Sequence, residues 1–194
     1  DILVELAFDW PFASQSAAHF IDEILKSNLG AGPIYVGRDF RFGQLRRGDI
    51  DTLRAAGLEV TALEAVGDED GQVFSSSRAR EAIHTGNMAA AAEILGRPWE
   101  IRGAVFRGDQ RGRQIGYPTA NVALGETIHP DYGIYAARVQ VLEDGPESEW
   151  FLSATNIGIR PMFEVPTGQV EAHILDFDRD IYGKTLRIHP VKRL

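Results

Sequence analysis

The stretch Gln169-Val170-Glu171-Ala172-His173-Ile174-Leu175 alternates polar and apolar side chains. Successive side chains of a β-strand point to opposite faces, so Glu171 and His173 are expected on one face, opposite Val170, Ala172 and Ile174. Further segments of the second half alternate in the same way, at residues 100–107, 134–142, 150–155 and 185–188. Turns rich in Gly, Pro and Asp separate them at regular intervals, which predicts a small antiparallel β-barrel or sandwich.

The first half of the chain alternates strand and helix signals instead. Strands are expected at residues 2–8, 33–37 and 58–63. Helices are expected after the caps Ser16 and Asp49, and at about residues 77–84 and 88–95. Such alternation predicts a parallel sheet with helical crossovers. We therefore expect an α/β domain over residues 1–96, followed by an all-β domain over residues 97–194.

Composition and charge exclude several classes of protein. The chain has 194 residues, of which 44% are hydrophobic and 25% charged, as in globular domains. A net charge of -8 argues against a protein that mainly coats nucleic acid. With no cysteine, disulfides, thiolate zinc sites and cysteine nucleophiles are excluded, and a reducing cytoplasm is the expected compartment. No apolar run is long enough to predict a membrane span.

A loop rich in glycine and arginine follows the first segment of the barrel half. Gly108, Gly112 and Gly116 recur at every fourth position, with Arg111 and Arg113 between them. Such a loop leaves backbone N–H groups uncovered, so a polyphosphate can approach closely while the guanidinium groups add charge. The spacing matches neither a P-loop nor a dinucleotide fingerprint. On glycine spacing alone, a flexible surface loop remains the simpler interpretation.

The loop runs into Pro118-Thr119-Ala120-Asn121. Thr119 and Asn121 lie two residues apart, so in an extended segment their side chains point to the same side. A hydroxyl and an amide oxygen there would suit Mg²⁺, which prefers oxygen ligands and shares them with substrate phosphates. An ordinary turn, in which Thr and Asn bind backbone groups, is the alternative.

Glu171 is the third candidate. A carboxylate held on a rigid strand can accept the proton of a substrate hydroxyl, which is the role of a general base. A solvent-facing glutamate is the default interpretation of the strand taken by itself.

Together these segments resemble the riboflavin kinase family over residues 96–194. The resemblance rests on the loop ending in Pro-Thr-Ala-Asn and on three later motifs: residues 155–161 (TNIGIRP), 170–177 (VEAHILDF) and 181–184 (IYGK). It implies a Greek-key β-barrel. It also implies that Thr119 and Asn121 hold the Mg²⁺ of Mg-ATP, and that Glu171 is the base for the ribityl 5′-hydroxyl. The loop from Gly108 to Gly116, with Arg111, Gly112, Arg113 and the adjoining Pro118, would bind ATP. Met162 stands where the family commonly has Thr.

The first half resembles the adenylyltransferase module that bacteria fuse to this kinase in bifunctional FAD synthetase, a Rossmann-like nucleotidyltransferase. Residues 37–43 (GRDFRFG) and 74–80 (FSSSRAR) carry the similarity. It implies nucleotide and flavin contacts from Asp39, Phe40, Ser75, Ser76, Ser77 and Arg80. Serines at a helix start beside arginines form a phosphate cradle. The alternatives are a simple N-cap beside a solvated basic turn, and a core role for Phe40.

One motif of the adenylyltransferase family is absent from these residues. The family has an early His-x-Gly-His motif, and no two of the five histidines have that spacing. Since the chain opens within a strand-like pattern, we expect an N-terminal segment to precede residue 1. The family also continues past Leu194 into residues that help close the flavin site.

The sequence therefore predicts Mg-ATP-dependent phosphorylation of riboflavin to FMN, and adenylylation of FMN to FAD in the complete protein. Its expected partners are riboflavin, FMN and ATP, without nucleic acid or membrane. The alternative is a non-catalytic flavin or nucleotide sensor that kept the barrel and lost the chemistry.

Overall fold

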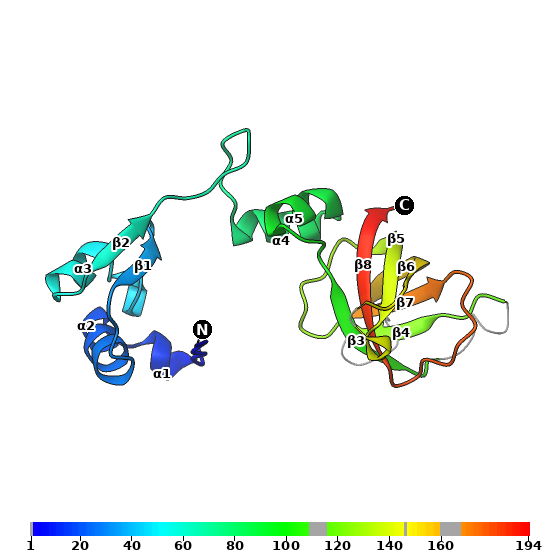
Figure 1. Cartoon of the computed structure of the whole chain (residues 1–194), viewed down its shortest axis with the longest axis horizontal. Coiled ribbons are helices and arrows are strands. Elements are labelled where there is room, and N and C mark those ends of the chain that lie inside the picture. The colour runs from blue at the N-terminus through cyan, green and yellow to red at the C-terminus, as the bar shows by residue number, and fades with distance from the viewer. Residues whose placement is uncertain (1, 109–115, 146, 160–167) are drawn as a thin grey trace. The chain divides into compact units, whose positions relative to one another are not determined.

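The computed structural model describes residues 2–108, 116–145, 147–159 and 168–194. The chain divides into two compact units, Asp1–Val73 and Phe74–Leu194, and each is described by itself. Figure 1 shows a small α/β unit at the N-terminal end of the chain and a β-barrel at its C-terminal end. This combination of α/β and all-β parts confirms the predicted fold class.

The first unit is built from short helices around two parallel strands. Its elements are α1 (Trp10–Ala13), α2 (Ala17–His19), the π-helix η1 (Phe20–Asn28), β1 (Ile34–Gly37), the 3-10 turn η2 (Gln44–Arg46), α3 (Ile50–Ala55) and β2 (Val60–Leu63). Ser16 and Asp49 are N-caps, as predicted. Ser16 Oγ accepts a hydrogen bond from the His19 N–H at 3.1 Å, and Asp49 Oδ1 accepts one from the Thr52 N–H at 2.9 Å.

The strands β1 and β2 pair in parallel, with Ile34 beside Val60 and Gly37 beside Leu63. A small core of Ile21, Phe42 and Leu53 lies beneath them. The parallel pairing is the one that the strand and helix alternation predicted.

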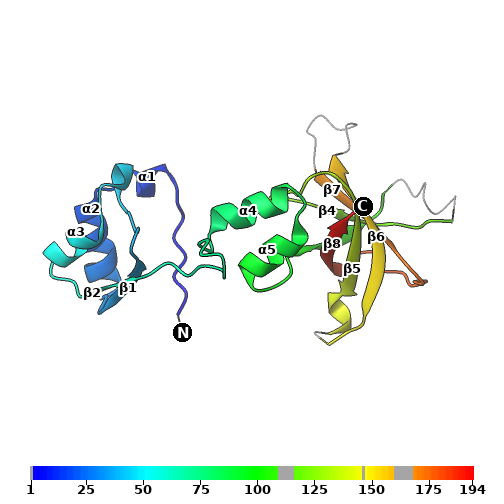
Figure 2. The ribbon, with the colours of Figure 1, turned by 90° about the horizontal axis from the view of Figure 1, so that it is seen from above.

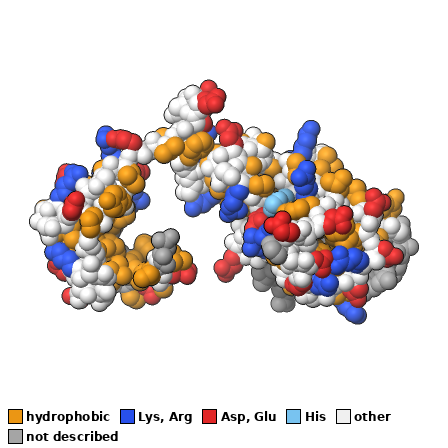
Figure 3. All heavy atoms as spheres, in the orientation of Figure 1, with side chains coloured by type: hydrophobic (Ala, Val, Ile, Leu, Met, Phe, Trp, Pro, Cys, Tyr) orange, Lys and Arg blue, Asp and Glu red, His pale blue; other side chains and the backbone are white. Residues whose placement is uncertain are grey.

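The prediction of a strand over residues 2–8 is wrong. These residues form neither a helix nor a strand, and Ile2, Leu3 and Phe8 are exposed by 92%, 89% and 81%. Their apolar run is strand-like, but a strand forms only where a neighbouring strand satisfies its N–H and C=O groups. Hydrophobic side chains lie at the surface on the face of this unit that Figure 3 shows.

Two helices open the second unit, α4 (Ser76–His84) and α5 (Met88–Leu95). They lie within the residues 1–96 expected to form the first domain, and they bury Ala82, Ile83, Met88 and Ala91 in one cluster with the barrel core. In Figure 2, α5 lies next to the barrel. The turn between the helices needs Gly86: its φ is +73°, and a Cβ there would lie 2.9 Å from the Tyr135 hydroxyl.

The barrel is closed and antiparallel. Its strands are β3 (Ile101–Phe106), β4 (Ala120–Ala123), β5 (Gly133–Val141), β6 (Trp150–Ile159), β7 (Gly168–Ile174) and β8 (Thr185–Arg193), with the 3-10 turn η3 (Leu142–Asp144) after β5. Their order around the barrel is β3-β4-β7-β6-β5-β8. The strands β5, β6 and β7 follow one another, and β8 returns beside β5. This is the Greek-key arrangement that was expected.

Alternate residues of most strands fill the barrel, whereas β4 buries Ala120, Asn121 and Val122 in succession. Tyr135, Val139, Val170, Leu186 and Ile188 are completely buried. Along β7, Val170, Ala172 and Ile174 are buried while Glu171 and His173 are not, so the predicted alternation of faces is confirmed. The Tyr135 hydroxyl donates to the Asp131 carbonyl at 2.5 Å, and burial raises the pKa of Tyr135.

A charged cluster joins β3 to β8. Glu100 lies within 3.2 Å of Arg187 Nε and 3.1 Å of His189 Nε2, and it also pairs with Arg102. Burial opposes ionisation of Glu100, but the hydrogen bonds from His189 and Arg102 and the charges of Arg102 and Arg187 outweigh it. The net effect is a lowered pKa of Glu100.

Among the described residues, no helix combines the length and the apolar character needed to cross a membrane.

The barrel core provides the first prediction. Leu186→Ala removes a completely buried side chain, so we expect the free energy of unfolding to fall by about 2–5 kcal/mol. Leu152→Ala is the matched control, because Leu152 lies on β6 with 61% of its surface exposed, and it should cost less than about 1 kcal/mol. Chemical denaturation measures both, and equal losses would contradict the assignment of Leu186 to the core.

The charged cluster provides a pH-dependent prediction. Because the pKa of Glu100 is lowered on folding, its contribution to stability is present above the ordinary glutamate pKa of 4.5 and is lost as the pH falls through the folded-state pKa. Glu100→Gln should therefore reduce the free energy of unfolding by on the order of 1 kcal/mol at neutral pH. The deficit should shrink as the pH falls below 4.5. Denaturation at a series of pH values tests this, with the exposed Glu93→Gln as control. A deficit that does not change with pH would argue against an electrostatic role.

Candidate active site

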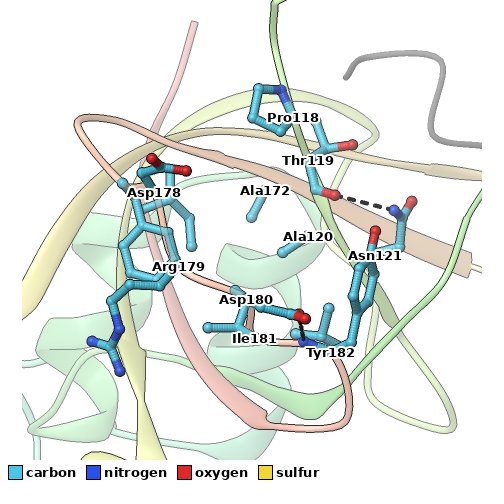
Figure 4. Close-up of a pocket in the computed structure, with 13 residues that line it drawn as sticks. Pro118, Thr119, Ala120, Asn121, Ala172, Asp178, Arg179, Asp180, Ile181 and Tyr182 are labelled. Atoms are coloured by element: carbon cyan, nitrogen blue, oxygen red, sulfur yellow. Dashed lines mark hydrogen bonds between the residues drawn. The ribbon is translucent and has the colours of Figure 1, made fainter. Parts of the chain in front are cut away.

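A pocket of about 250 Å³ opens between the start of β4, the inward face of β7 and the loop that precedes β8. Figure 4 shows Pro118 and Thr119 along one rim and Asp180, Ile181 and Tyr182 along the other, with Ala120 and Ala172 between them. The two alanines are small, so the facing strands leave open space here. The pocket therefore has an apolar floor and a rim that carries oxygen atoms.

The loop from Phe177 to Tyr182 forms one wall of this pocket, and it is tied to the turn η3. Arg179 Nη2 donates to both carboxylate oxygens of Asp144, at 2.9 and 2.7 Å. Glu143 accepts the backbone N–H of Thr185 at 2.8 Å, and this hydrogen bond lowers the pKa of Glu143. Within the wall itself, Asp180 Oδ1 accepts the Tyr182 N–H at 3.1 Å. The turn η3 thus anchors the pocket wall at Arg179 and the start of β8 at Thr185.

The structure places Asn121 at the edge of the pocket, with 6% of its surface exposed. Asn121 Oδ1 accepts a hydrogen bond from Gln169 Nε2 at 2.7 Å, and Asn121 Nδ2 donates to the Thr119 carbonyl at 3.3 Å. Gly108 packs directly on this amide, because a Cβ at Gly108 would lie 2.8–3.0 Å from its atoms. Gly108, the first glycine of the predicted loop, therefore lies against the side chain of Asn121.

Glu171 lies directly across from Asn121 in the pairing of β4 with β7, and across from Asn156 in the pairing of β7 with β6. Three polar side chains thus form a row across three strands. Asn156 Nδ2 donates to Glu171 Oε2 at 3.5 Å. Side chains directly opposite in an antiparallel sheet have Cβ atoms about 5 Å apart, so Glu171 is an immediate neighbour of Asn121. Glu171 itself does not line the pocket.

His173 connects β7 to the Pro118–Asn121 segment at its other end. Its Nδ1 lies 2.9 Å from the Pro118 carbonyl oxygen, which can only accept, so Nδ1 carries the hydrogen. The Tyr117 ring packs edge-on against His173 at 5.4 Å. Two side chains of β7, Gln169 and His173, therefore hold the two ends of this segment.

Among the other predicted loop residues, Gly116 is described and does not line the pocket. Gly116 has a φ of +85°, which favours glycine. Arg111, Gly112 and Arg113 lie outside the described residues.

The residues predicted for the adenylyltransferase occupy two places. Asp39 is exposed after β1, and Phe40 stacks on Phe42 at 5.5 Å, beside the core of the first unit. Ser75 caps α4 by accepting the Arg78 N–H at 3.2 Å. Ser76 Oγ accepts a hydrogen bond from Arg80 Nη1 at 3.2 Å, and Ser77 is exposed in the first turn. The N-cap formed by Ser75 is thus present, and so is the contact of Phe40 with the core of the first unit.

Gln169 and the pocket wall are parts of the site that the sequence does not predict. Gln169 reads as an ordinary polar residue of an alternating strand, and its long-range contact with Asn121 has no local signal. Asp180 and Tyr182 do carry a signal, because acidic and aromatic residues crowd the short loop from Phe177 to Tyr182 before β8. His173 is on the face that the alternation indicated.

The oxygen atoms of this site fit a hard cation. Thr119 offers a hydroxyl and Asn121 an amide oxygen, and Asp178 and Asp180 add carboxylates to the same pocket. Magnesium binds oxygen ligands of these kinds together with substrate phosphates. Within the described part of the chain, no group of three or more His, Cys, Asp or Glu side chains forms a metal site by itself.

These features define a small closed barrel with a preformed pocket for a polar ligand and a carboxylate on the adjoining strand. Such pockets, with few and well-placed polar groups, are typical of small-molecule enzymes. The chain belongs to the riboflavin kinase family, whose model matches residues 95–194. The FAD synthetase family model matches residues 1–78.

Curated relatives carry both parts together. The chain is 38% identical over 192 residues to the bifunctional riboflavin kinase/FMN adenylyltransferase of Escherichia coli K12, covering 97% of this chain and 60% of that protein. It is 35% identical to the protein of the same name from Haemophilus influenzae and 34% identical to that from Bacillus subtilis, covering 61% of each. The chain thus spans about three fifths of the length of the curated relatives it matches.

A solved structure has the same fold. The crystal structure described as a macrolide-efflux protein from Streptococcus pneumoniae superposes with a TM-score of 0.81 at 34% identity. The match covers 96% of this chain and 60% of that one.

Proposed function

We propose that the barrel domain transfers the γ-phosphoryl group of ATP to the 5′-hydroxyl of riboflavin, giving FMN and ADP. The observation that carries this proposal is the position of Asn121, which lines the pocket and lies directly opposite Glu171 in the pairing of β4 with β7. The family of the barrel supplies the substrate class.

The pocket suits the nucleotide. Its volume and its apolar floor fit part of a nucleotide, and Thr119 and Asn121 at its edge would hold the cation that accompanies the phosphates. When bound, Mg²⁺ neutralises the charge that builds on the phosphates during transfer. The glycine-rich loop would cover the phosphates: Gly108, Arg111, Gly112, Arg113 and Gly116 are assigned to ATP from the sequence, with Pro118 at the pocket rim.

Glu171 is the proposed general base. The hydroxyl oxygen of riboflavin forms a bond to the γ-phosphorus, the bond to the β–γ bridging oxygen breaks, and Glu171 accepts the hydroxyl proton. Phosphoryl transfer depends mainly on positioning and charge neutralisation. The strand β7 is paired with β4 on one side and with β6 on the other, which supports a fixed place for the carboxylate next to Asn121.

For the complete protein we propose adenylylation of FMN to FAD as a second activity. The match of residues 1–78 to FAD synthetase and the curated bifunctional relatives support it. Asp39, Phe40, Ser75, Ser76, Ser77 and Arg80 are the residues assigned to this reaction. We take residues 1–96 as the adenylyltransferase part and residues 97–194 as the kinase, both acting in the cytoplasm on riboflavin, FMN and ATP.

The test is incubation with riboflavin, ATP and Mg²⁺, followed by chromatographic separation of the flavins with fluorescence detection. FMN as product supports the kinase, and FAD formed after FMN supports both activities. Binding of flavin or ATP without any product would instead support a non-catalytic sensor.

Replacement of the proposed base gives a sharp prediction. Glu171→Gln keeps the size of the side chain and removes its ability to accept a proton, so kcat for FMN formation should fall by about 10²- to 10⁴-fold. Binding of riboflavin and ATP, measured by calorimetry, should change little. The exposed Glu147→Gln is the control and should turn over normally. A Glu171→Gln variant with the turnover of the parent would remove Glu171 from the base role.

The metal assignment makes a separate prediction. Asn121→Ala removes a proposed ligand oxygen, so the Mg²⁺ concentration for half-maximal FMN formation should rise by about 10-fold or more. A Mg²⁺ titration of initial rates measures this shift. The same titration curve for variant and parent would count against Asn121 as a ligand.

A further inference from the structure

The side-chain amides of Gln169 and Asn121 form a buried pair. Gln169 Nε2 donates to Asn121 Oδ1 at 2.7 Å, and the two residues are exposed by only 8% and 6%. Most side-chain hydrogen bonds in proteins involve the backbone or water, so a buried bond between two side-chain amides is uncommon. Gln169 is neither the proposed general base nor one of the proposed metal ligands.

Strand register explains why a glutamine makes this contact. Asn121 lies directly opposite Glu171, and Gln169 opposite Ala123, so Gln169 and Asn121 are diagonal neighbours across the ladder. Diagonal neighbours have Cα atoms about 7–8 Å apart, a distance that long side chains span. An asparagine at position 169, shorter by one methylene, would fall short.

The hydrogen bonds of Asn121 select one orientation of its amide. If the amide were turned over, Nδ2 would face the donor Nε2 of Gln169. If both amides turned over together, Asn121 Oδ1 would face the Thr119 carbonyl, which accepts a hydrogen bond from Nδ2 in the structure. Gly108, packed on the amide, leaves little room for another rotamer. The amide oxygen is thus fixed.

We propose that Gln169 is a positioning residue, which holds the Asn121 amide oxygen in place for the cation that accompanies ATP. Gln169 uses one lone pair of Asn121 Oδ1, and the second lone pair stays available to a ligand. Its action is indirect, since it reaches the cation only through Asn121. The inference rests on the proposed function, because it takes Asn121 as a ligand.

The experiment measures ATP binding in the absence of riboflavin, so no FMN forms and activity is not the readout. ATP is titrated into the full chain by calorimetry, at a series of Mg²⁺ concentrations and in EDTA. Gln169→Met keeps the length of the side chain and removes its donor. We expect the Mg²⁺ concentration for half-maximal tightening of ATP binding to rise on the order of 10-fold, as for other residues that orient a metal ligand. ATP binding in EDTA should stay within about 2-fold of the parent, because that binding does not use the oriented oxygen.

A double-mutant cycle separates positioning from a general structural effect. If Gln169 acts only through Asn121, Gln169→Met combined with Asn121→Ala should need no more Mg²⁺ than Asn121→Ala alone. Gln140→Met is the matched control. Gln140 is also a buried barrel glutamine, with 1% exposure, and it donates to the Ser148 carbonyl at 2.9 Å. This control should lose stability and keep the Mg²⁺ dependence of the parent.

Chemical denaturation establishes that each variant is folded, and Gln169→Asn, which keeps a polar amide, replaces Gln169→Met if the latter does not fold. An unchanged Mg²⁺ dependence in the Gln169 variant, or additive effects in the double variant, would overturn the positioning role. If ATP binding to the parent chain does not depend on Mg²⁺, the ligand role of Asn121 is overturned. The inference about Gln169 then fails with it. The two failures are distinguishable, because only the second appears in the unmodified chain.

Discussion

The pairing of β4 with β7 is the constraint on which the candidate site depends. It sets Asn121 opposite Glu171 and Ala120 opposite Ala172, so the polar pair and the pocket floor come from the same ladder. Side chains alternate with a period of two, so a slip of one residue would turn Glu171 into the barrel and expose Val170 and Ala172. The cost of burying a carboxylate and exposing the core fixes the register. The geometry of the site is therefore secured by the same forces that fold the barrel.

Small residues let the neighbouring segments approach that ladder. Gly108 lies on the Asn121 amide, and a Cβ at Gly168 would lie 2.8 Å from the Leu124 side chain. On the other side, Ala120 and Ala172 leave the space that becomes the pocket, whose wall is anchored by the Arg179–Asp144 ion pair. Close packing on one side of β4 and open space on the other are both consequences of side-chain size. Together they leave Asn121 buried in a residue pair with Gln169 and lining the edge of the pocket.

Much of this could be predicted from the sequence, and the parts that could not have physical causes. Alternation along residues 169–175 predicted the strand and the outward face of Glu171, since period-two burial is a local signal. The short strand β4 was described only as an extended segment, because four residues carry little pattern. Residues 2–8 have a strand pattern but no strand partner in the structure, and pairing is a tertiary property. The contact of Gln169 with Asn121 joins residues 48 positions apart, so no window of sequence contains it.

The helices α4 and α5 connect the two proposed activities within one folding unit. Ser75, Ser76, Ser77 and Arg80, assigned to the adenylyltransferase, lie at the start of α4, while Ala82 and Ile83 near its end are buried with the barrel core. The turn after α4 packs on Tyr135 of β5 through Gly86, which has no Cβ to keep them apart. Without the barrel, these apolar side chains would lose the surface that covers them, and a helix of nine residues is marginal in water by itself. The barrel that carries the proposed kinase site therefore also stabilises the helix that carries part of the other proposed site.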